Sequence, residues 1–518
     1  MIYCNSSPKG ELLHILLYHY GYRGNNMLFN SYIFVLLFLP VTVAVYHLIN
    51  KSGRFSAAKI FLLAMSFWFY CYSEPENVIV LLLSIVINYA ISTFAFTEER
   101  PEKAKKVFLT LGIIINIAAL LYFKYTGFFS DILNDLFKTS FDFKAILVPL
   151  GVSFFTFGQI AYLVDSYRAP LEKYSLLDYS LFVVFFPKIS VGPIAFAKEM
   201  IPQFNDSLKK SADQDNIAKG LYMFVLGLAK KVIIADNLGV MVDWCYQNTN
   251  IMDTFLALMM TVGYTMQIYF DFSGYCDMAS GICKMLNFEL PVNFDSPYRS
   301  LSIDEFWKKW HMSLTRFFRQ YVYFPLGGNR KGKVRTYLNI FLIFLLSGLW
   351  HGANYTFILW GVIHGVGMCL SKAFGKYTKK LPAAIRFIFT FIYINLTWVF
   401  FRARTVTEAI SVIKALFSLS FNTLDKNTNF VVSVMPAEFE LFQWLLSLNH
   451  PELTKLSGLI VTILIVLTAS LISVLAKNPQ ERIKAFRPNR RLLAGTVILL
   501  VWSVISLSNI STFIYTNF

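Results

Sequence analysis

The sequence predicts an all-α membrane protein that crosses the bilayer many times. Hydrophobic residues make up 56% of the 518 residues, and the mean hydropathy is +0.52. Charged residues make up only 15% of the chain, whereas a soluble protein carries about 25%. Apolar runs of about 20 residues, long enough to cross a bilayer, recur along the chain. A globule of this size cannot bury so much apolar surface, which excludes a soluble enzyme, a disulfide scaffold and a disordered chain.

The apolar runs predict about 11–13 transmembrane helices. Each run is expected to be helical because a backbone in lipid must satisfy its hydrogen bonds within the segment. The predicted spans are residues 30–49, 57–73, 78–96, 107–124, 145–165, 217–238, 252–272, 336–350, 355–374, 384–402, 457–476 and 492–514.

Other segments are apolar or amphipathic without being simple spans. Residues 176–197 contain two prolines and Gly192, so we expect a broken, re-entrant segment whose backbone is shielded by protein or water. Residues 301–330 are amphipathic and are not expected to cross the bilayer. Residues 128–144 and 403–415 are predicted as interfacial helices at opposite surfaces.

The charge distribution indicates a multi-pass membrane protein, which we expect in the inner or plasma membrane. The formal net charge is +16, but the basic residues lie in short clusters between apolar runs, at residues 98–106, 329–335 and 477–491. Basic loops that flank membrane spans follow the positive-inside bias and are expected in the cytoplasm. This pattern argues against nucleic acid as a partner and for a lipid bilayer.

The N-terminal residues and the cysteines predict where the membrane domain begins and whether it contains a disulfide or a metal site. Residues 1–26 are too polar to span, and Met27 opens a hydrophobic segment. We expect residues 1–26 to be a disordered extension or a start-site artefact, and residues 27–518 to form the membrane domain. The six cysteines contain no CxxC pair and mostly lie in apolar stretches, so we predict no disulfide and no metal site.

Histidine is the most informative residue type, because ionisable groups in membrane segments are costly. His351 ends the apolar run 339–351, and Gly348, Gly352 and Asn354 around it weaken the helix. A partly desolvated imidazole at that point suits a general base. The alternative is a core histidine that is hydrogen-bonded to a neighbouring carbonyl.

His311 is predicted to lie on the apolar face of an amphipathic helix over residues 304–321. At about 100° per residue, His311 shares that face with aromatic side chains, and basic side chains occupy the other face. The basic face could bind lipid headgroups or the phosphates of an acyl carrier. The basic residues of this helix and of the glycine loop that follows are predicted to bind the donor; they are Lys308, Lys309, Arg316, Arg330 and Lys333.

Two further sequence patterns are better explained by a structural role than by a catalytic one. His364 lies between Gly361 and Gly365, a small-residue pattern that lets helices pack closely. The glycine loop 327–334 resembles a phosphate-binding loop, but Val334 replaces the hydroxyl residue that would hold magnesium, so an ATPase is excluded. Residues predicted to line a cavity are Asp271, Asp277, Trp350 and Asn354, and a structural role is favoured for the two aspartates.

Taken together, these segments resemble the membrane-bound O-acyltransferase family, in its bacterial branch typified by alginate O-acetyltransferase. The matching segments occur in order after Met27, and the core motifs cover residues 145–403. They are "LGVSFFTFGQIAYLVDSYR" (150–168), "FFPKISVGPI" (185–194), "DFSGYCDMASG" (271–281), "FWKKWHMSLTRFFRQYVYFPLGGNRKG" (306–332), "SGLWHGANYTFILWGVIHG" (347–365) and "WVFFRA" (398–403).

The resemblance implies helices arranged around a central funnel. It implies that His351, in the "LWHGA" match, is the catalytic histidine and that His311, in the "WH.S" match, is its companion. It also implies an acyl donor from the cytoplasm and an acceptor across the membrane. One departure is mild: Val191 stands where the family usually has alanine.

We therefore expect a membrane O-acetyltransferase without a bound cofactor. The donor is expected to be acetyl-CoA or another acyl thioester, and the acceptor the hydroxyl groups of an extracytoplasmic polysaccharide. Transfer is expected either directly or through a secreted SGNH-type partner acetyltransferase. D-alanyl transfer to teichoic acid and O-acetylation of peptidoglycan are the alternative enzymatic activities. A polysaccharide or lipid translocator is the alternative from another class, but the chain shows no internal duplication.

Overall fold

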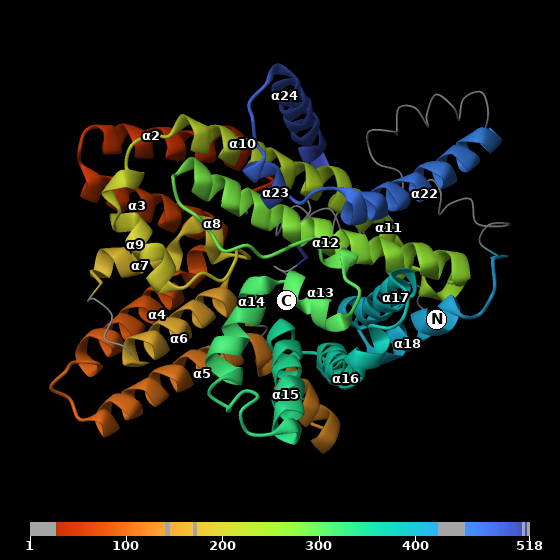
Figure 1. The fold of residues 1–518 in the computed structure, drawn as a ribbon, viewed down its shortest axis with the longest axis horizontal. Coiled ribbons are helices and arrows are strands. Elements are labelled where there is room, and N and C mark those ends of the chain that lie inside the picture. The colour runs from red at the N-terminus through yellow and green to blue at the C-terminus, as the bar shows by residue number, and fades with distance from the viewer. Residues whose placement is uncertain (1–26, 140–145, 169–173, 423–450, 510–512, 515–518) are drawn as a thin grey trace, which may run out of the picture.

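The computed structural model describes residues 27–139, 146–168, 174–422, 451–509 and 513–514, and the extension expected at 1–26 lies outside them. The described part is helical and contains no strand (Figure 1). Eight of its helices are long and apolar enough to cross a membrane; they cover Phe34–Lys51, Phe55–Ser73, Pro75–Ala95, Glu102–Phe137, Lys333–His351, Tyr355–Thr378, Ala383–Arg402 and Gly458–Leu475. The prediction of an all-α, multi-pass membrane protein is confirmed.

The first half of the chain supplies the helices that surround a long central helix, α12. Their bounds are α2 (Leu39–Lys51), α3 (Phe55–Ser73), α4 (Val78–Ala90), α5 (Glu102–Phe137), α6 (Val152–Arg168), α7 (Leu176–Val184), α8 (Phe186–Ile189), α9 (Ala197–Asn205), α10 (Gln214–Ala229), η5 (Lys230–Ala235), α11 (Asp236–Gln247) and α12 (Thr254–Met285).

The second half begins with two short helices and continues with long apolar ones. Their bounds are α13 (Ile303–Lys309), α14 (Met312–Phe318), α15 (Lys333–His351), α16 (Tyr355–Thr378), α17 (Ala383–Arg402), α18 (Val406–Leu416), α22 (Pro451–Leu475), α23 (Pro479–Lys484) and α24 (Arg490–Ile505). Many of these helices begin at a side chain that accepts a hydrogen bond from the first turn. Such capping residues are Ser302, Asn354, Thr405, Asn478 and Asn489.

Helices occupy every predicted span, but fewer of them than the expected 11–13 qualify as membrane spans in the described residues. The helices at the predicted spans 145–165, 217–238, 252–272 and 492–514 are not among the eight that are long and apolar enough. Helix lengths also differ from the apolar runs. The single helix α5 of 36 residues covers the span predicted at 107–124 and most of the interfacial helix predicted at 128–144. Residues 140–144 lie outside the described part. The helix predicted at 403–415 is α18. The segment 176–197 is broken as predicted, with α7 and α8 separated at Phe185, and its side chains from Asp178 onward are buried in protein.

The prediction of one continuous helix over residues 304–321 is wrong. The chain forms α13 and α14, with Trp310 and His311 between them. His311 has a φ of 43° and a ψ of 53°, the left-handed conformation, which no α-helix can contain. The helical pattern still separated apolar from basic side chains correctly, because the apolar ones are buried on both sides of the break.

Helix α12 crosses the middle of the molecule, with α10 on one side and α13 and α14 on the other (Figure 1). Glycines let α10 and α12 approach closely: a Cβ added at Gly227 would lie 2.5 Å from the Gly274 carbonyl oxygen, and one at Gly220 would lie 2.6 Å from that of Gly281. Small residues are the usual means by which membrane helices pack backbone to backbone.

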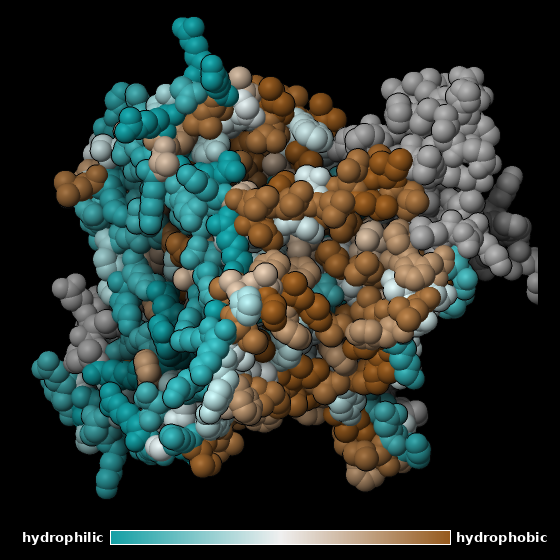
Figure 2. Space-filling model, turned by 45° about the vertical axis from the view of Figure 1, so that its right-hand side comes forward, coloured by the Kyte–Doolittle hydropathy of each residue, from teal (hydrophilic) through white to brown (hydrophobic). Residues whose placement is uncertain are grey.

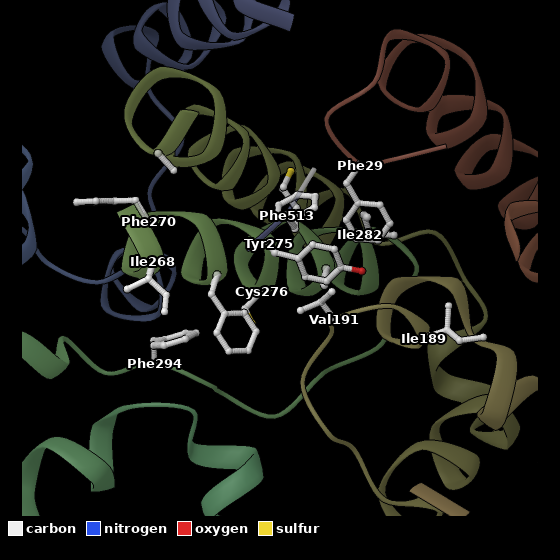
Figure 3. Close-up of a cluster of buried hydrophobic side chains, with 14 of the residues drawn as sticks. Phe29, Ile189, Val191, Ile268, Phe270, Tyr275, Cys276, Ile282, Phe294 and Phe513 are labelled. Atoms are coloured by element: carbon white, nitrogen blue, oxygen red, sulfur yellow. The ribbon is translucent and has the colours of Figure 1, made fainter. Parts of the chain in front are cut away.

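The core around α12 joins segments that are far apart in the sequence. Figure 3 shows the Tyr275 hydroxyl directed toward the 189–191 segment, and this hydroxyl is hydrogen-bonded to Ser190. The side chains drawn in this cluster include Phe29, Ile189, Val191, Ile268, Phe270, Cys276, Ile282, Phe294 and Phe513. The broken segment is therefore held against the central helix.

The outer surface is divided by polarity. On the face in Figure 2, hydrophobic side chains cover one side of the molecule and hydrophilic ones gather on the other. Exposed apolar residues are frequent on the membrane-spanning helices, such as Ile79 and Phe94, with 67% and 68% of their surface accessible. Lipid contact accounts for apolar side chains that water would not accept at such density.

Candidate active site

His351 is the last residue of α15, and the helix ends at Gly352. Its imidazole is buried among three aromatic rings, whose centroids lie 4.8 Å (Trp350), 5.2 Å (Trp360) and 5.1 Å (Phe401) away. The predicted position at a helix end in an apolar environment is therefore confirmed. Gly348 does not weaken the helix, which runs through it, and instead lets α16 approach.

A lysine that the sequence reasoning missed holds the end of this helix. Lys124 Nζ, on α5, donates to the carbonyl oxygens of Trp350 at 2.5 Å and His351 at 2.9 Å. Carbonyls in the last turn of a helix have no partner within the helix, and a cation is favoured at that end. The signal was available, because a lysine inside the apolar run 107–124 is costly and requires a partner.

His311 lies beside His351 in space. Its ring centroid is 6.2 Å from Trp350 and 4.8 Å from Phe272, and the side chain is fully buried. Trp350 thus contacts both imidazoles, one from the α13–α14 junction and one from the end of α15. We call the group His311, His351 and Trp350 the histidine centre. Burial lowers the pKa of His311 to about 3, so that its imidazole is neutral at physiological pH.

Asn293 organises the backbone and side chain at His311. Its Oδ1 lies 3.3 Å from His311 Nδ1 and accepts hydrogen bonds from the Ser313 amide at 3.1 Å and the Ser313 hydroxyl at 2.7 Å. Its carbonyl oxygen accepts from the Met312 amide at 3.0 Å, and its Nδ2 donates to Cys276 Sγ at 3.3 Å. No sequence pattern singled out Asn293, because its partners come from two other segments of the chain.

The basic residues predicted to bind the donor differ in their partners and their exposure. Lys308 and Lys309 pair with the carboxylates of Asp304 and Glu305, one turn earlier in α13. Arg330 and Lys333 are exposed in and after the glycine turn that precedes α15. Their role in binding the donor stays a prediction.

Arg316 has a structural partner. Its guanidinium makes a two-pronged ion pair with Glu199 on α9, at 2.5 Å and 2.9 Å, and also donates to the Ile194 carbonyl. Such a forked pair fixes geometry as well as charge. Arg316 therefore connects α14 to the broken segment, whichever ligand it meets.

The carboxylates predicted to line a cavity are both ion-paired. Lys230 Nζ lies 2.6 Å from Asp277 Oδ2, and Lys231 Nζ lies 2.7 Å from Asp271 Oδ1. These contacts join the π-helical segment η5 to α12. We call the four residues the paired-charge region. Their role in lining a cavity stays a prediction, and the structure gives them a role in joining helices.

Asn354 and His364 serve packing and capping. The Asn354 side chain accepts from the Thr356 amide at the start of α16 and donates to the Arg404 carbonyl at 2.8 Å. His364 Nδ1 accepts from the Trp307 indole N–H at 3.2 Å. Gly361 beside it approaches Gly348 on α15, which confirms the close helix packing predicted from the small residues.

Lys188 is a further residue that sequence reasoning did not assign to the site. It is buried in α8, its ammonium lies 4.2 Å from the centroid of the Phe182 ring, and it lines a small cavity with Phe154 and Ile194. Phe154 contacts Trp350 at 5.5 Å between centroids, so this cavity borders the aromatic wall of the histidine centre.

Comparison with known proteins identifies the family. The MBOAT, membrane-bound O-acyltransferase family matches residues 81–406, a range that includes both histidines of the centre. The chain belongs to this family. A peptidoglycan O-acetyltransferase of Helicobacter pylori is 39% identical over 424 residues, which cover 76% of this chain and 80% of that protein.

Other relatives belong to two named activities. A protein described as a probable alginate O-acetylase AlgI, from Pseudomonas aeruginosa, is 38% identical over 401 residues, covering 76% of this chain and 75% of its own. A teichoic acid D-alanyltransferase of Bacillus subtilis is 30% identical over 242 residues, covering 45% of this chain and 60% of its own. The expected resemblance is confirmed, and the protein is a membrane O-acyltransferase.

Proposed function

We propose that this acyltransferase moves acetyl groups from acetyl-CoA in the cytoplasm to hydroxyl groups of an extracytoplasmic polysaccharide. The observation that carries the proposal is the histidine centre, where two imidazoles from separate segments meet at one tryptophan inside an apolar protein. The names of two relatives, a peptidoglycan O-acetyltransferase and a probable alginate O-acetylase, support acetyl as the group and a glycan as the acceptor.

The proposed reaction needs one proton acceptor. The oxygen of the acceptor hydroxyl attacks the carbonyl carbon of the thioester while His351 accepts the hydroxyl proton. The carbon–sulfur bond then breaks, and the thiolate leaves and takes up the proton from the imidazolium. The products are an O-acetyl ester and free thiol. His311 orients one of the reacting groups, and the surrounding rings exclude water that would hydrolyse the thioester.

The two sides of the membrane supply different substrates. The donor phosphates would meet Lys308, Lys309, Arg330 and Lys333, and also Arg316 on α14, which contacts the end of the broken segment at Ile194. Placement in the inner or plasma membrane follows from a cytoplasmic donor and an external glycan. The acceptor hydroxyl belongs either to the glycan itself or to a secreted SGNH-type partner that completes the transfer.

The test uses membrane vesicles that contain the full-length protein or its His351→Ala variant. Vesicles receive acetyl-labelled acetyl-CoA together with purified peptidoglycan or with an alginate-type polymer, each with and without secreted partner protein. Base-labile label on one polymer, present with the wild type and missing with the variant, supports the proposal and names the acceptor. Transfer from a D-alanyl carrier protein but not from acetyl-CoA would favour the D-alanyl alternative. Polymer transport without any acyl transfer would favour a translocator.

A further inference from the structure

We infer that Asn293 is a positioning residue that fixes His311 as its Nδ1–H tautomer and leaves Nε2 as the proton acceptor of that imidazole. The inference rests on the proposed function for its kinetic consequence, whereas the tautomer itself is a property of the structure. It assigns a hydrogen-bonding character to each nitrogen of the His311 imidazole, which the sequence motif alone does not give.

The orientation of the Asn293 amide follows from its neighbours. The backbone N–H of Ser313 points at one terminal atom of the amide, 3.1 Å away. A backbone N–H can only donate, so that atom must be the oxygen. The other terminal atom, Nδ2, then donates to the Cys276 sulfur at 3.3 Å. A flipped amide would place an N–H group against the Ser313 N–H and lose both bonds.

The tautomer of His311 follows from that orientation. Oδ1 of Asn293 is an acceptor, so His311 Nδ1, 3.3 Å away, must carry the hydrogen. A neutral imidazole carries one ring hydrogen, and its second nitrogen then holds a lone pair. His311 is neutral in its buried position, as its low pKa indicates. Nε2 therefore accepts a hydrogen bond or a proton.

The same asparagine maintains the unusual backbone. His311 adopts a left-handed conformation, with a φ of 43°, that is unfavourable for a residue with a side chain. Asn293 holds both residues that follow, Met312 through its carbonyl and Ser313 through its side chain. The Ser313 hydroxyl also accepts from the Ile194 amide at 3.0 Å, which ties the loop to the broken segment. The serine of the "WH.S" motif thus has a defined structural task.

The assignment changes the role of His311. A neutral Nε2 without a hydrogen cannot polarise the acyl carbonyl, because that requires a donor. It can instead accept from the attacking hydroxyl or from the thiol, and so orient a group that gives up a proton. His311 therefore acts as a hydrogen-bond acceptor and not as a donor to the acyl oxygen.

The first arm of the test measures the tautomer directly. Protein labelled with ¹⁵N at histidine is examined by NMR in detergent, and the signal that disappears in His311→Ala belongs to His311. A protonated Nδ1 and an unprotonated Nε2 are expected in the wild type, and a mixture of tautomers in Asn293→Ala. Asn293→Asp keeps an acceptor oxygen and is expected to keep the tautomer. An Nε2–H form in the wild type would overturn the inference, whatever the enzyme acts on.

The second arm measures acetyl transfer. Asn293→Ala is expected to lower kcat about 10–100-fold, the usual cost of losing a group that orients a functional imidazole, with the donor KM little changed. Asn293→Asp should restore part of kcat and move the acidic limb of the pH–kcat profile to higher pH, because a carboxylate stabilises the imidazolium. Asn88→Ala, which removes a buried asparagine from the α4–α5 contact, is the matched control for folding.

A double variant separates positioning from a general structural role. Asn293→Ala added to His311→Ala should cost no further activity, because a residue that acts through another has no effect once that residue is gone. If the double variant lost activity by the product of the two single-variant losses, the inference would be overturned. A change in donor KM alone would also overturn it. A wild type that transfers no acetyl would contradict the proposed function, while the NMR arm would still decide the tautomer.

Discussion

The histidine centre and the paired-charge region both bury polar side chains in an apolar environment, but they do so in different ways. In the paired-charge region each lysine meets a carboxylate within 2.7 Å, and the amide of Ile514 donates to the second oxygen of Asp271. In the histidine centre the imidazole of His311 meets a neutral amide, and aromatic rings enclose both histidines.

The difference shows which kind of buried polar group points to chemistry. Opposite charges in contact stabilise each other's ionised forms and join helices, and neither can easily gain or lose a proton. Neutral imidazoles that are oriented by amides and backbone can accept a proton and return it. Burial of an ionisable residue in a membrane protein is therefore an ambiguous signal until its partners are known.

His351→Ala is expected to have the largest effect on the histidine centre. Acetyl transfer should fall about 10²–10⁴-fold, the usual contribution of a general base. The protein should still accumulate in the membrane, because the surrounding rings and Lys124 do not depend on the imidazole. Polymer acetyl content, normalised to protein abundance in cells that lack the native protein, measures the loss. Normal acetylation by a stable variant would contradict the proposed mechanism.

His311→Ala should have an intermediate effect on transfer. Water can replace part of the orienting function of Nε2, so a smaller loss than that of His351→Ala is expected at equal abundance. The ratio of kcat values, measured with saturating acetyl-CoA, compares the two histidines. If His311→Ala proved more damaging than His351→Ala, the two residues would have to exchange roles.

Lys231→Met should affect abundance more than chemistry, which sharpens the contrast between the regions. Removal of one partner leaves the Asp271 carboxylate buried without its ammonium, a loss of about 3–5 kcal/mol. Less protein should accumulate, while transfer per folded molecule stays the same. Replacing both residues, Lys231→Met with Asp271→Leu, should recover part of the abundance, because Lys231 also pairs with Asp236 at 2.8 Å and that carboxylate still loses its partner. Western blots and detergent melting curves provide the measurement; a stable single variant would refute the structural role.

His364→Ala is expected to have the smallest effect on transfer. The variant removes the acceptor of the Trp307 indole N–H, at a cost of about 1–3 kcal/mol to the free energy of unfolding. The melting temperature should fall by a few degrees, and kcat by much less than in His311→Ala. A loss of activity as large as that of His351→Ala would extend the histidine centre to a third residue.

Much of the architecture could be predicted because each membrane helix corresponds to a local run of apolar residues in the sequence. The apolar runs coincide with helices, and the break in residues 176–197 follows from its prolines and Gly192. The helix over 304–321 was predicted as continuous because its apolar period is helical, and the break at His311 depends on Asn293, which is 18 residues earlier. Local periodicity contains no information about such a contact.

The sequence by itself determined the fold class, the family and the two histidines, because each rests on composition or on a short motif. Only the tertiary structure decided how those histidines are held. Lys124 reaches the last carbonyls of α15 across 226 residues of sequence, and the charges of the paired-charge region meet across 40 and 47. A hydrogen bond or an ion pair requires atoms within about 3 Å, and only the packing of distant helices brings such atoms together.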